Sequence, residues 1–297
     1  MDDIDEPRVP KGKKSLPFPY NQDLSTVLRH LNRRTPWGRR QLANNKITAA
    51  LLRAGMRLLH RHLGPGARYP VTSERLLLGP LSLGSVADEF AQNDPPFACV
   101  GHGKSLLRDR WQPYSNFVTD LINFAVWEEN YRPQYRIRRA ANTKELVHGS
   151  DFVGAVHDIA YQTTAEGVEL PSVRLSLALM PTADGDDEIG RIISGVYADY
   201  LGSWKELYAA VIRERGLRLR AGLTLDDLAN ALSVATDGTI MRAIGDPGAG
   251  VVDDARRRSL MGTVALAVIH AFLEPAEDAS GLTLEQAVAA RFDRRTP

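Results

Sequence analysis

Apolar side chains recur along this chain at the three- to four-residue spacing of an amphipathic helix, and alternation with a period of two is scarce. The clearest early stripe lies in 44–63, where Ile47, Leu51 and Leu58 share one face and the turn residues Gly64-Pro65-Gly66 follow as a stop. This pattern predicts a nearly all-α protein.

The predicted helices differ in length on the two sides of Pro133. Before it, apart from the helix at 44–63, they are short and cover 23–32, 82–91, 103–111 and 114–127. A turn is expected at 33–40, which holds Pro36 and Gly38. Past Pro133 the predicted helices are longer and span 143–163, 171–180, 186–215, 225–244 and 253–273, with a last short helix at 283–292. Residues 1–20 lack periodicity and are expected to be disordered in isolation.

The composition adds limits on domain number, redox chemistry and location. A chain of 297 residues with 43% apolar and 25% charged residues forms one large soluble domain or two ordinary ones. Cys99 is the single cysteine, which rules out an intramolecular disulfide and a cysteine-based zinc cluster. The N-terminus has no apolar signal segment, and the longest apolar run, 264–273, is too short to span a bilayer. We therefore expect a cytoplasmic protein without a membrane partner.

The near-neutral total charge hides two regions of opposite sign. Residues 8–115 carry 18 Lys and Arg against 6 Asp and Glu, a local net charge of +12, whereas 116–297 carries 19 basic and 26 acidic residues. A basic third that also contains short amphipathic helices is typical of a protein that binds a polyanion, most often nucleic acid. A solvated basic surface without a partner is the alternative.

The order of helices in the basic third is that of a helix-turn-helix domain with a connecting helix behind it. The predicted helix at 103–111 carries Lys104, Arg108 and Arg110, which can enter the major groove of DNA, while Trp111 anchors the helix to the core. Each phosphate contact releases counterions, so that the affinity falls with salt. A basic arm before the domain can follow the minor groove or the backbone. The predicted DNA-binding residues are Arg33, Arg34, Arg39, Arg40, Lys46, Ser82, Lys104, Ser105, Arg108, Arg110 and Tyr114.

Five segments resemble the TetR family of bacterial transcription regulators. KITAALLRAGMRLLHRHL, SLGSVADEF and GKSLLRDRWQPYSNFVTDLI are similar to the family's helix-turn-helix and the helix that follows it. LTLDDLANALSVATDGTIMRAIGDP and RRRSLMGTVALAVIHAFL are similar to its two last long helices. In this register Trp111 takes the aromatic position that ends the recognition helix, and Arg108 falls where the family often has a phosphate-contacting tyrosine. The turn AQNDPPFACVGHG and the loop after the first helix are longer than the family pattern.

The resemblance implies a homodimeric, ligand-responsive repressor that is not an enzyme, needs no cofactor and binds a palindromic DNA operator. It implies an all-α fold with an N-terminal helix-turn-helix DNA-binding domain and a C-terminal helical dimerisation and effector-binding domain. The expected parts are a flexible basic extension at 1–42, the DNA-binding domain at 43–128, the effector-binding domain at 129–275 and a tail at 276–297.

Two further sets of residues follow from the resemblance. A pocket for a small apolar or aromatic effector is expected to be lined by Phe152, Val156, His157, Tyr161, Leu175, Leu179, Ile193, Tyr197, Tyr200 and Trp204. The dimer interface is expected to hold Leu232, Ala235, Ile240, Leu260, Val264 and Ile269. Apolar and aromatic residues at helical spacing are also what an ordinary core contains, which is the alternative for the pocket residues.

Two other functions stay open at this stage. The first is a helical dimer that binds an effector or a protein but has lost DNA binding. The second is a nucleotide-binding protein that uses ACVGHGKS (98–105), which approaches the phosphate-binding pattern GxxxxGK[ST] but has Ala98 in place of the first glycine. The histidines have no spacing typical of a metal site, and no catalytic pattern of side chains is present.

Overall fold

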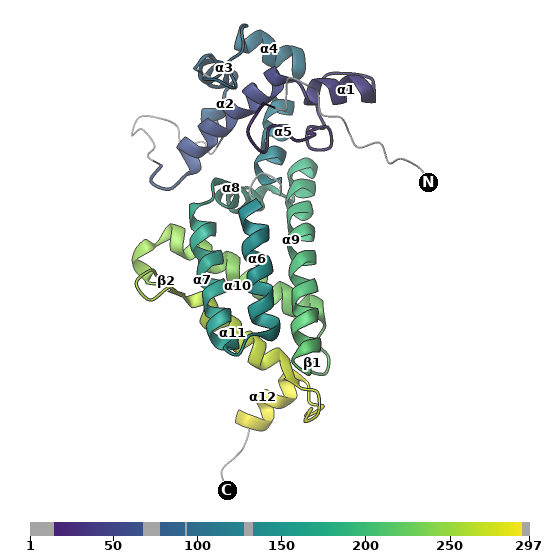
Figure 1. Ribbon diagram of the computed structural model, residues 1–297, viewed down its shortest axis with the longest axis vertical. Helices are drawn as coiled ribbons and strands as arrows, with labels where there is room; N and C mark the ends of the chain where they lie inside the picture. Colours follow the sequence, from purple (N-terminus) through teal and green to yellow (C-terminus); the bar gives the residue numbers. More distant parts are fainter. Residues whose placement is uncertain (1–14, 68–77, 93, 128–132, 293–297) are drawn as a thin grey trace. The chain divides into compact units, whose positions relative to one another are not determined.

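The computed structural model describes residues 15–67, 78–92, 94–127 and 133–292 of the chain. Within these ranges the protein is mostly helical, with twelve α-helices and four short strands (Figure 1). This confirms the predominantly α-helical fold that the apolar spacing predicts. The chain divides into two compact units. The N-terminal unit comprises residues 1–132 and 171–193, and the C-terminal unit comprises 133–170 and 194–297.

The division differs from the expected domain boundary, because 171–193 belongs to the N-terminal unit although it lies within the expected effector-binding domain. Helix α8 packs against α2 and α5 there, with Leu175 and Leu179 buried. The elements of this unit are α1 (Pro36–Ala43), α2 (Lys46–Leu63), η1 (Gly79–Leu81), α3 (Leu83–Ala91), α4 (Gly103–Arg110), α5 (Ser115–Val126), α8 (Pro171–Leu179), η3 (Met180–Thr182) and the first turns of α9 (Asp187–Glu214).

The C-terminal unit is a group of helices with two small antiparallel strand pairs, β1 with β4 and β2 with β3. Helix α11 packs against α7 and α10, and α7 also packs against α6. A continuous apolar core joins these helices and includes Trp204, Leu207 and Met261. Besides the rest of α9, the elements are α6 (Pro133–His148), α7 (Phe152–Glu169), β1 (Leu217–Leu219), α10 (Leu225–Gly245), η4 (Pro247–Ala249), β2 (Val252–Asp253), β3 (Arg258–Ser259), α11 (Leu260–Phe272), β4 (Leu273–Pro275) and α12 (Leu284–Phe292).

The described part of the N-terminal extension, 15–42, is folded rather than flexible. Leu24, Val27, Leu28 and Leu31 are buried, each at most 4% exposed. They form the apolar face that the sequence predicts for 23–32, although this stretch adopts turns instead of a helix. Burial of such a face removes apolar area from water and offsets the loss of chain entropy that disfavours an ordered extension. The expectation for residues 1–14 falls outside the described residues.

Two local predictions were wrong because polar residues make specific caps. The expected turn at 33–40 begins α1: Thr35 accepts a hydrogen bond from the Gly38 amide, and Pro36 takes the first helical position, where its missing N–H is not needed. The expected helix at 253–273 begins only at Leu260. The polar residues before it form the β2–β3 hairpin, in which Asp253 accepts from the Arg256 amide.

Candidate nucleic-acid interface and ligand cavity

Helices α3 and α4 pack against each other and against α2. Ser82 begins α3 by accepting a hydrogen bond from the Ser85 amide at 3.1 Å. The carboxylate of Glu89 in α3 is buried and lies 2.8 Å from Arg57 Nε and 3.1 Å from Arg61 Nη2 of α2. A Cβ at Gly103, the first residue of α4, would lie 2.8 Å from Ala87 Cα. A glycine there allows α4 to approach the α3 backbone closely.

The inner face of α4 is held by apolar residues, as the sequence predicts for Trp111. Leu107 is 0% exposed and Trp111 is 1% exposed, with its ring packed edge-on against Phe117. Trp111 Nε1 donates to Asp120 Oδ2 at 2.9 Å. Asp120 is itself fully buried and accepts hydrogen bonds from the Arg29 and His30 amides and from His30 Nδ1. One carboxylate therefore links the N-terminal segment, the end of α4 and α5.

The outer face of α4 presents Lys104, Ser105 and Arg108, which are all exposed. Lys46, Arg34 and Arg39 are exposed as well, and the latter two make no ion pair within the described part of the chain. Arg33 pairs with Asp109 at 3.2 Å and Arg40 with Asp23 at 3.0 Å. The surface of the N-terminal unit that carries α4 is thus basic, with some of its charge already neutralised.

Two predicted DNA-binding residues make hydrogen bonds inside the N-terminal unit instead. Arg110 is 5% exposed because it lies three residues after Leu107, on the inner face of α4. Its Nε donates a hydrogen bond to Thr48 Oγ1 at 3.3 Å, and its Nη1 donates one to the Leu106 carbonyl. The hydroxyl of Tyr114 donates to the Leu81 carbonyl at 2.6 Å, and burial raises the pKa of this phenol. Ser82 is exposed but caps α3.

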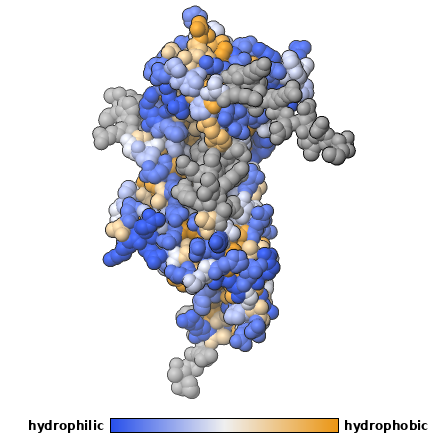
Figure 2. Space-filling model, in the orientation of Figure 1, coloured by the Kyte–Doolittle hydropathy of each residue, from blue (hydrophilic) through white to orange (hydrophobic). Residues whose placement is uncertain are grey.

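The surface near α4 also exposes apolar groups. Figure 2 shows a largely hydrophilic face, with an apolar patch at the end of the molecule where Figure 1 places α3 and α4. In the segment that joins these helices Val100 is 98% exposed. The residues 97–100, which precede the glycines of the phosphate-binding pattern, form no strand. A phosphate-binding loop of that type connects a strand to a helix, so the geometry does not support nucleotide binding at this position.

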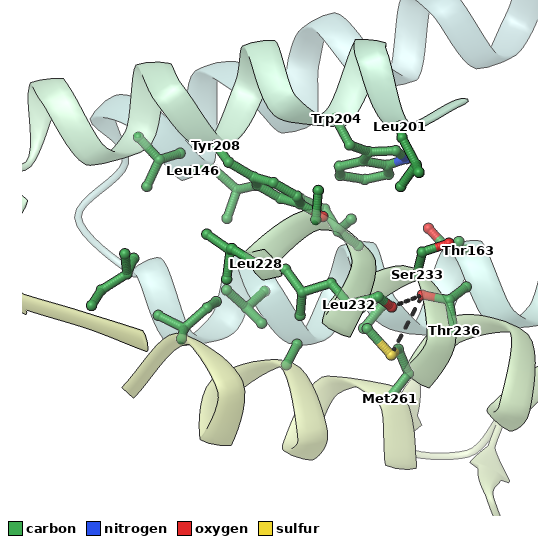
Figure 3. A pocket seen from close by; sticks show the side chains of 18 of the residues that line it. Leu146, Thr163, Leu201, Trp204, Tyr208, Leu228, Leu232, Ser233, Thr236 and Met261 are labelled. Atoms are coloured by element: carbon green, nitrogen blue, oxygen red, sulfur yellow. Dashed lines mark hydrogen bonds between the residues drawn. The ribbon is translucent and has the colours of Figure 1, made fainter. Parts of the chain in front are cut away.

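The C-terminal unit encloses a cavity of about 80 Å³, several times the roughly 10–15 Å³ that one water molecule needs (Figure 3). Trp204 stacks on Tyr208 of α9 at one wall, and α10 and α11 supply the opposite wall (Figure 3). The lining is almost entirely apolar, as is usual for sites that bind small organic molecules. It includes Phe152, Val156, Ile159, Tyr200, Trp204, Tyr208, Leu228, Leu232, Ser233, Thr236, Met261, Ala265 and Ile269.

The cavity contains hydroxyl groups whose hydrogen bonding differs. Thr236 Oγ1 donates to the Leu232 carbonyl at 2.8 Å and lies 3.5 Å from Met261 sulfur (Figure 3). Ser233, which is 6% exposed, has a buried Oγ with no hydrogen-bond partner among the described residues. A buried hydroxyl without a partner costs about 1–3 kcal/mol. Ser233 Oγ is therefore a position at which a polar atom of a bound molecule would form a favourable hydrogen bond.

The structure brings together four of the ten predicted pocket residues: Phe152, Val156, Tyr200 and Trp204. Three others, Leu175, Leu179 and Ile193, are buried in the N-terminal unit and are core residues. The remaining three have partners away from the cavity lining. His157 packs against Gly262, Tyr161 donates to Asp254 at 2.9 Å, and Tyr197 donates to Asp237 at 2.7 Å.

The sequence-based prediction missed the whole α10 and α11 wall of the cavity, and on the other helices it missed residues such as Leu146 of α6, Ile159 of α7 and Tyr208 of α9. Leu232 and Ile269 were expected at a dimer interface but line the cavity, and Ser233 and Thr236 were not singled out. The sequence signal for this wall of the cavity was the pair of hydroxyl residues Ser233 and Thr236, which lie one turn apart on the buried side of an apolar helix. Apolar spacing alone does not distinguish a residue that faces a cavity from one that faces another subunit.

Apolar residues of the same two helices remain exposed, and we call Val234, Gly238, Met241 and Leu260, together with the half-buried Val264, the α10–α11 face. Val234 is 71% exposed, Met241 is 54% exposed and Leu260 is 49% exposed. Of the other expected interface residues, Ala235 is half-buried beside this face, whereas Ile240 is 4% exposed and packs onto Gly167. Ile240 is therefore a core residue of the single chain.

No family model, curated protein or solved structure matches the chain. Among the described residues no group of three or more His, Cys, Asp or Glu is placed to hold a metal ion. No helix in the described part of the chain has the length and apolar content needed to cross a membrane.

Proposed function

We propose that this protein is a DNA-binding transcription regulator that acts as a homodimer and responds to a small apolar ligand. The observation that carries the proposal is the exposed cationic face of α4, with Lys104, Ser105 and Arg108 outward while Leu107 and Trp111 fix the inner face. A short basic helix packed in this way across a second helix matches the size and charge of the DNA major groove. The resemblance of the sequence to TetR regulators supports the same proposal.

The cavity supports ligand control of DNA binding through α9. This helix contributes Ile189 and Ile192 to the core of the N-terminal unit, and further along it contributes Trp204 and Tyr208 to the cavity. A ligand that binds better to one arrangement of α9 shifts the population toward that arrangement. The affinity for DNA then changes by the ratio of ligand affinities for the two arrangements.

The test is selection of duplexes from a random-sequence pool by the full chain, followed by fluorescence anisotropy of the recovered duplex and a scrambled one. We expect tighter binding of the recovered duplex and a steep fall of affinity between 50 and 200 mM salt, roughly 10³-fold or more for six phosphate contacts. Recovery of no duplex, or equal binding of both, would refute the proposal. It would favour the ligand- or protein-binding dimer without DNA affinity, which the cavity and the α10–α11 face support by themselves.

Ser233→Ala is expected to stabilise the ligand-free protein by about 1 kcal/mol, because it removes the partnerless buried hydroxyl. The matched control is Thr236→Val, which removes a satisfied hydroxyl one turn away and should destabilise by about 1 kcal/mol. Urea unfolding measures both changes. Destabilisation by both variants would show that Ser233 has a partner and is not a binding position.

The double variant Val234→Glu, Met241→Glu is expected to convert a dimer to a folded monomer. Both side chains are more than half exposed in the single chain, so the fold is retained, while a two-fold interface would gather four carboxylates. Repulsion of several kcal/mol raises the dimer dissociation constant by about 100-fold or more. Sedimentation velocity measures the change, and Val288→Glu on α12 is the control. A dimer that persists in the double variant places the interface elsewhere.

A further inference from the structure

Helix α1 exposes a large aromatic side chain that the fold does not use. Trp37 is 73% exposed, whereas Leu42 and Ala43 are the residues by which α1 is buried. The exposed residues Arg34 and Arg39 lie three positions before it and two positions after it in the chain. The ring leaves a large apolar area in contact with water, which a partner can bury.

The position of α1 relative to α4 is fixed by hydrogen bonds and ion pairs. Before α1, the Asn32 amide donates to the Arg110 carbonyl at 2.7 Å, and Arg33 pairs with Asp109 at 3.2 Å. At its end, Asn44 Nδ2 donates to Asp23 Oδ1 at 2.7 Å. The start of α1 is therefore held beside the last turn of α4, within one compact unit.

The charge next to Trp37 favours one kind of partner. Arg34 and Arg39 make no ion pair within the described ranges, so their charge is available to a polyanion. Phosphate groups and planar bases are combined in nucleic acids, and proteins bind them with arginines and with inserted or stacked side chains. The start of α1 lies beside the last turn of the helix proposed to read the major groove, so we take the minor groove that flanks the α4 site as the target of α1.

We propose that α1 is a second DNA-contacting element, in which Trp37 enters the minor groove beside the α4 site and Arg34 and Arg39 bind the flanking phosphates. This inference rests on the proposed function. It assigns a role to a segment that lies before the helix-turn-helix and that forms no part of the major-groove contact.

The first readout is the accessibility of Trp37 to acrylamide, a collisional quencher of tryptophan fluorescence. The chain has four tryptophans, of which Trp111 and Trp204 are at most 9% exposed and Trp127 is half-buried, so the signal of Trp37 is taken as the difference between wild type and Trp37→Phe. On addition of the recovered duplex we expect the accessible component of the wild type to become protected. Trp37→Phe should show no such change.

The second readout is affinity for the same duplex. Trp37→Ala should weaken binding by roughly 5- to 100-fold, the range for loss of an aromatic contact to nucleic acid. Arg39→Gln should lower the slope of log affinity against log salt by about 1. The controls are Val288→Ala and Arg256→Gln, which change an exposed apolar residue and an exposed arginine of the C-terminal unit. Circular dichroism verifies that each variant is folded.

The outcomes separate this inference from the proposed function. If the wild type binds the recovered duplex while Trp37 stays open to acrylamide and Trp37→Ala binds as tightly, α1 is not a DNA element although the protein is a DNA-binding one. If no duplex is recovered, both proposals fail together. Protection of Trp37 by vesicles of anionic phospholipid, in place of DNA, would overturn the inference in favour of a membrane surface.

Discussion

The variant Lys104→Glu, Arg108→Glu is expected to lose at least about 30-fold in affinity for the recovered duplex, because each replaced contact is worth roughly 1–3 kcal/mol. Both side chains lie on the exposed face of α4, one turn apart, and neither serves the core. Replacing two cations by carboxylates also removes two released counterions, so the salt slope should fall by about 1.8. Fluorescence anisotropy at several salt concentrations measures both quantities.

A matched control has the same change of charge in the other unit. Arg256 of the β2–β3 turn is exposed, and Arg256→Glu together with Lys144→Glu alters the net charge of the chain by the same amount. This control should bind the duplex within about threefold of wild type, since it leaves the cationic face of α4 unchanged. Equal losses in both double variants would mean that net charge and not α4 governs binding.

Asp120→Ala is expected to reduce the free energy of unfolding of the N-terminal unit by about 3–5 kcal/mol, because it leaves buried donors unsatisfied around a deleted charge. These donors are Trp111 Nε1 at 2.9 Å, the Arg29 and His30 amides, and the His30 ring at 2.8 Å. Urea unfolding followed by circular dichroism measures the change. Asp88→Ala, at an exposed position of α3, is the control and should alter stability by less than about 0.5 kcal/mol.

The pH dependence of the stability of the His30→Gln variant tests the same contact in a second way. The hydrogen bond to Asp120 raises the pKa of His30 above its ordinary value of about 6.5, against the effect of burial. A raised pKa means that the protonated ring stabilises the folded state fully below pH 6.5, and that this stability is lost as the pH rises through the folded-state pKa. The stability difference between wild type and His30→Gln should therefore shrink with rising pH. A difference independent of pH would contradict the contact.

The long helices could be predicted from the sequence because their apolar stripes are local. Helix α2, with Leu51 and Leu58 on one face, and α10, which begins at the capping residue Thr224, are examples. The folded conformation of the N-terminal extension could not be predicted, because it depends on Asp120, some 90 residues away along the chain. Helix α1 was missed since Pro36 and Gly38 are typical of turns, and only the Thr35 cap distinguishes a helix start.

The candidate sites could be predicted in part for similar reasons. The exposure of Lys104 and Arg108 follows from the burial of Leu107, and the same helical geometry places Arg110 inside, which the spacing alone could have indicated. For the cavity, Tyr200 and Trp204 of α9 were predicted, but Leu232 of α10 and Ile269 of α11 were assigned to a dimer interface. Both assignments fit an apolar helix face, and only the three-dimensional packing decides between them.

The most direct test of the central claim, a dimer that presents two basic helices to one duplex, is a hydroxyl-radical footprint of the wild-type protein on the recovered DNA. We predict two protected half-sites related by two-fold symmetry, with centres roughly one helical turn, about 10 base pairs, or slightly more apart. One protected patch, or uniform protection along the duplex, would contradict the account.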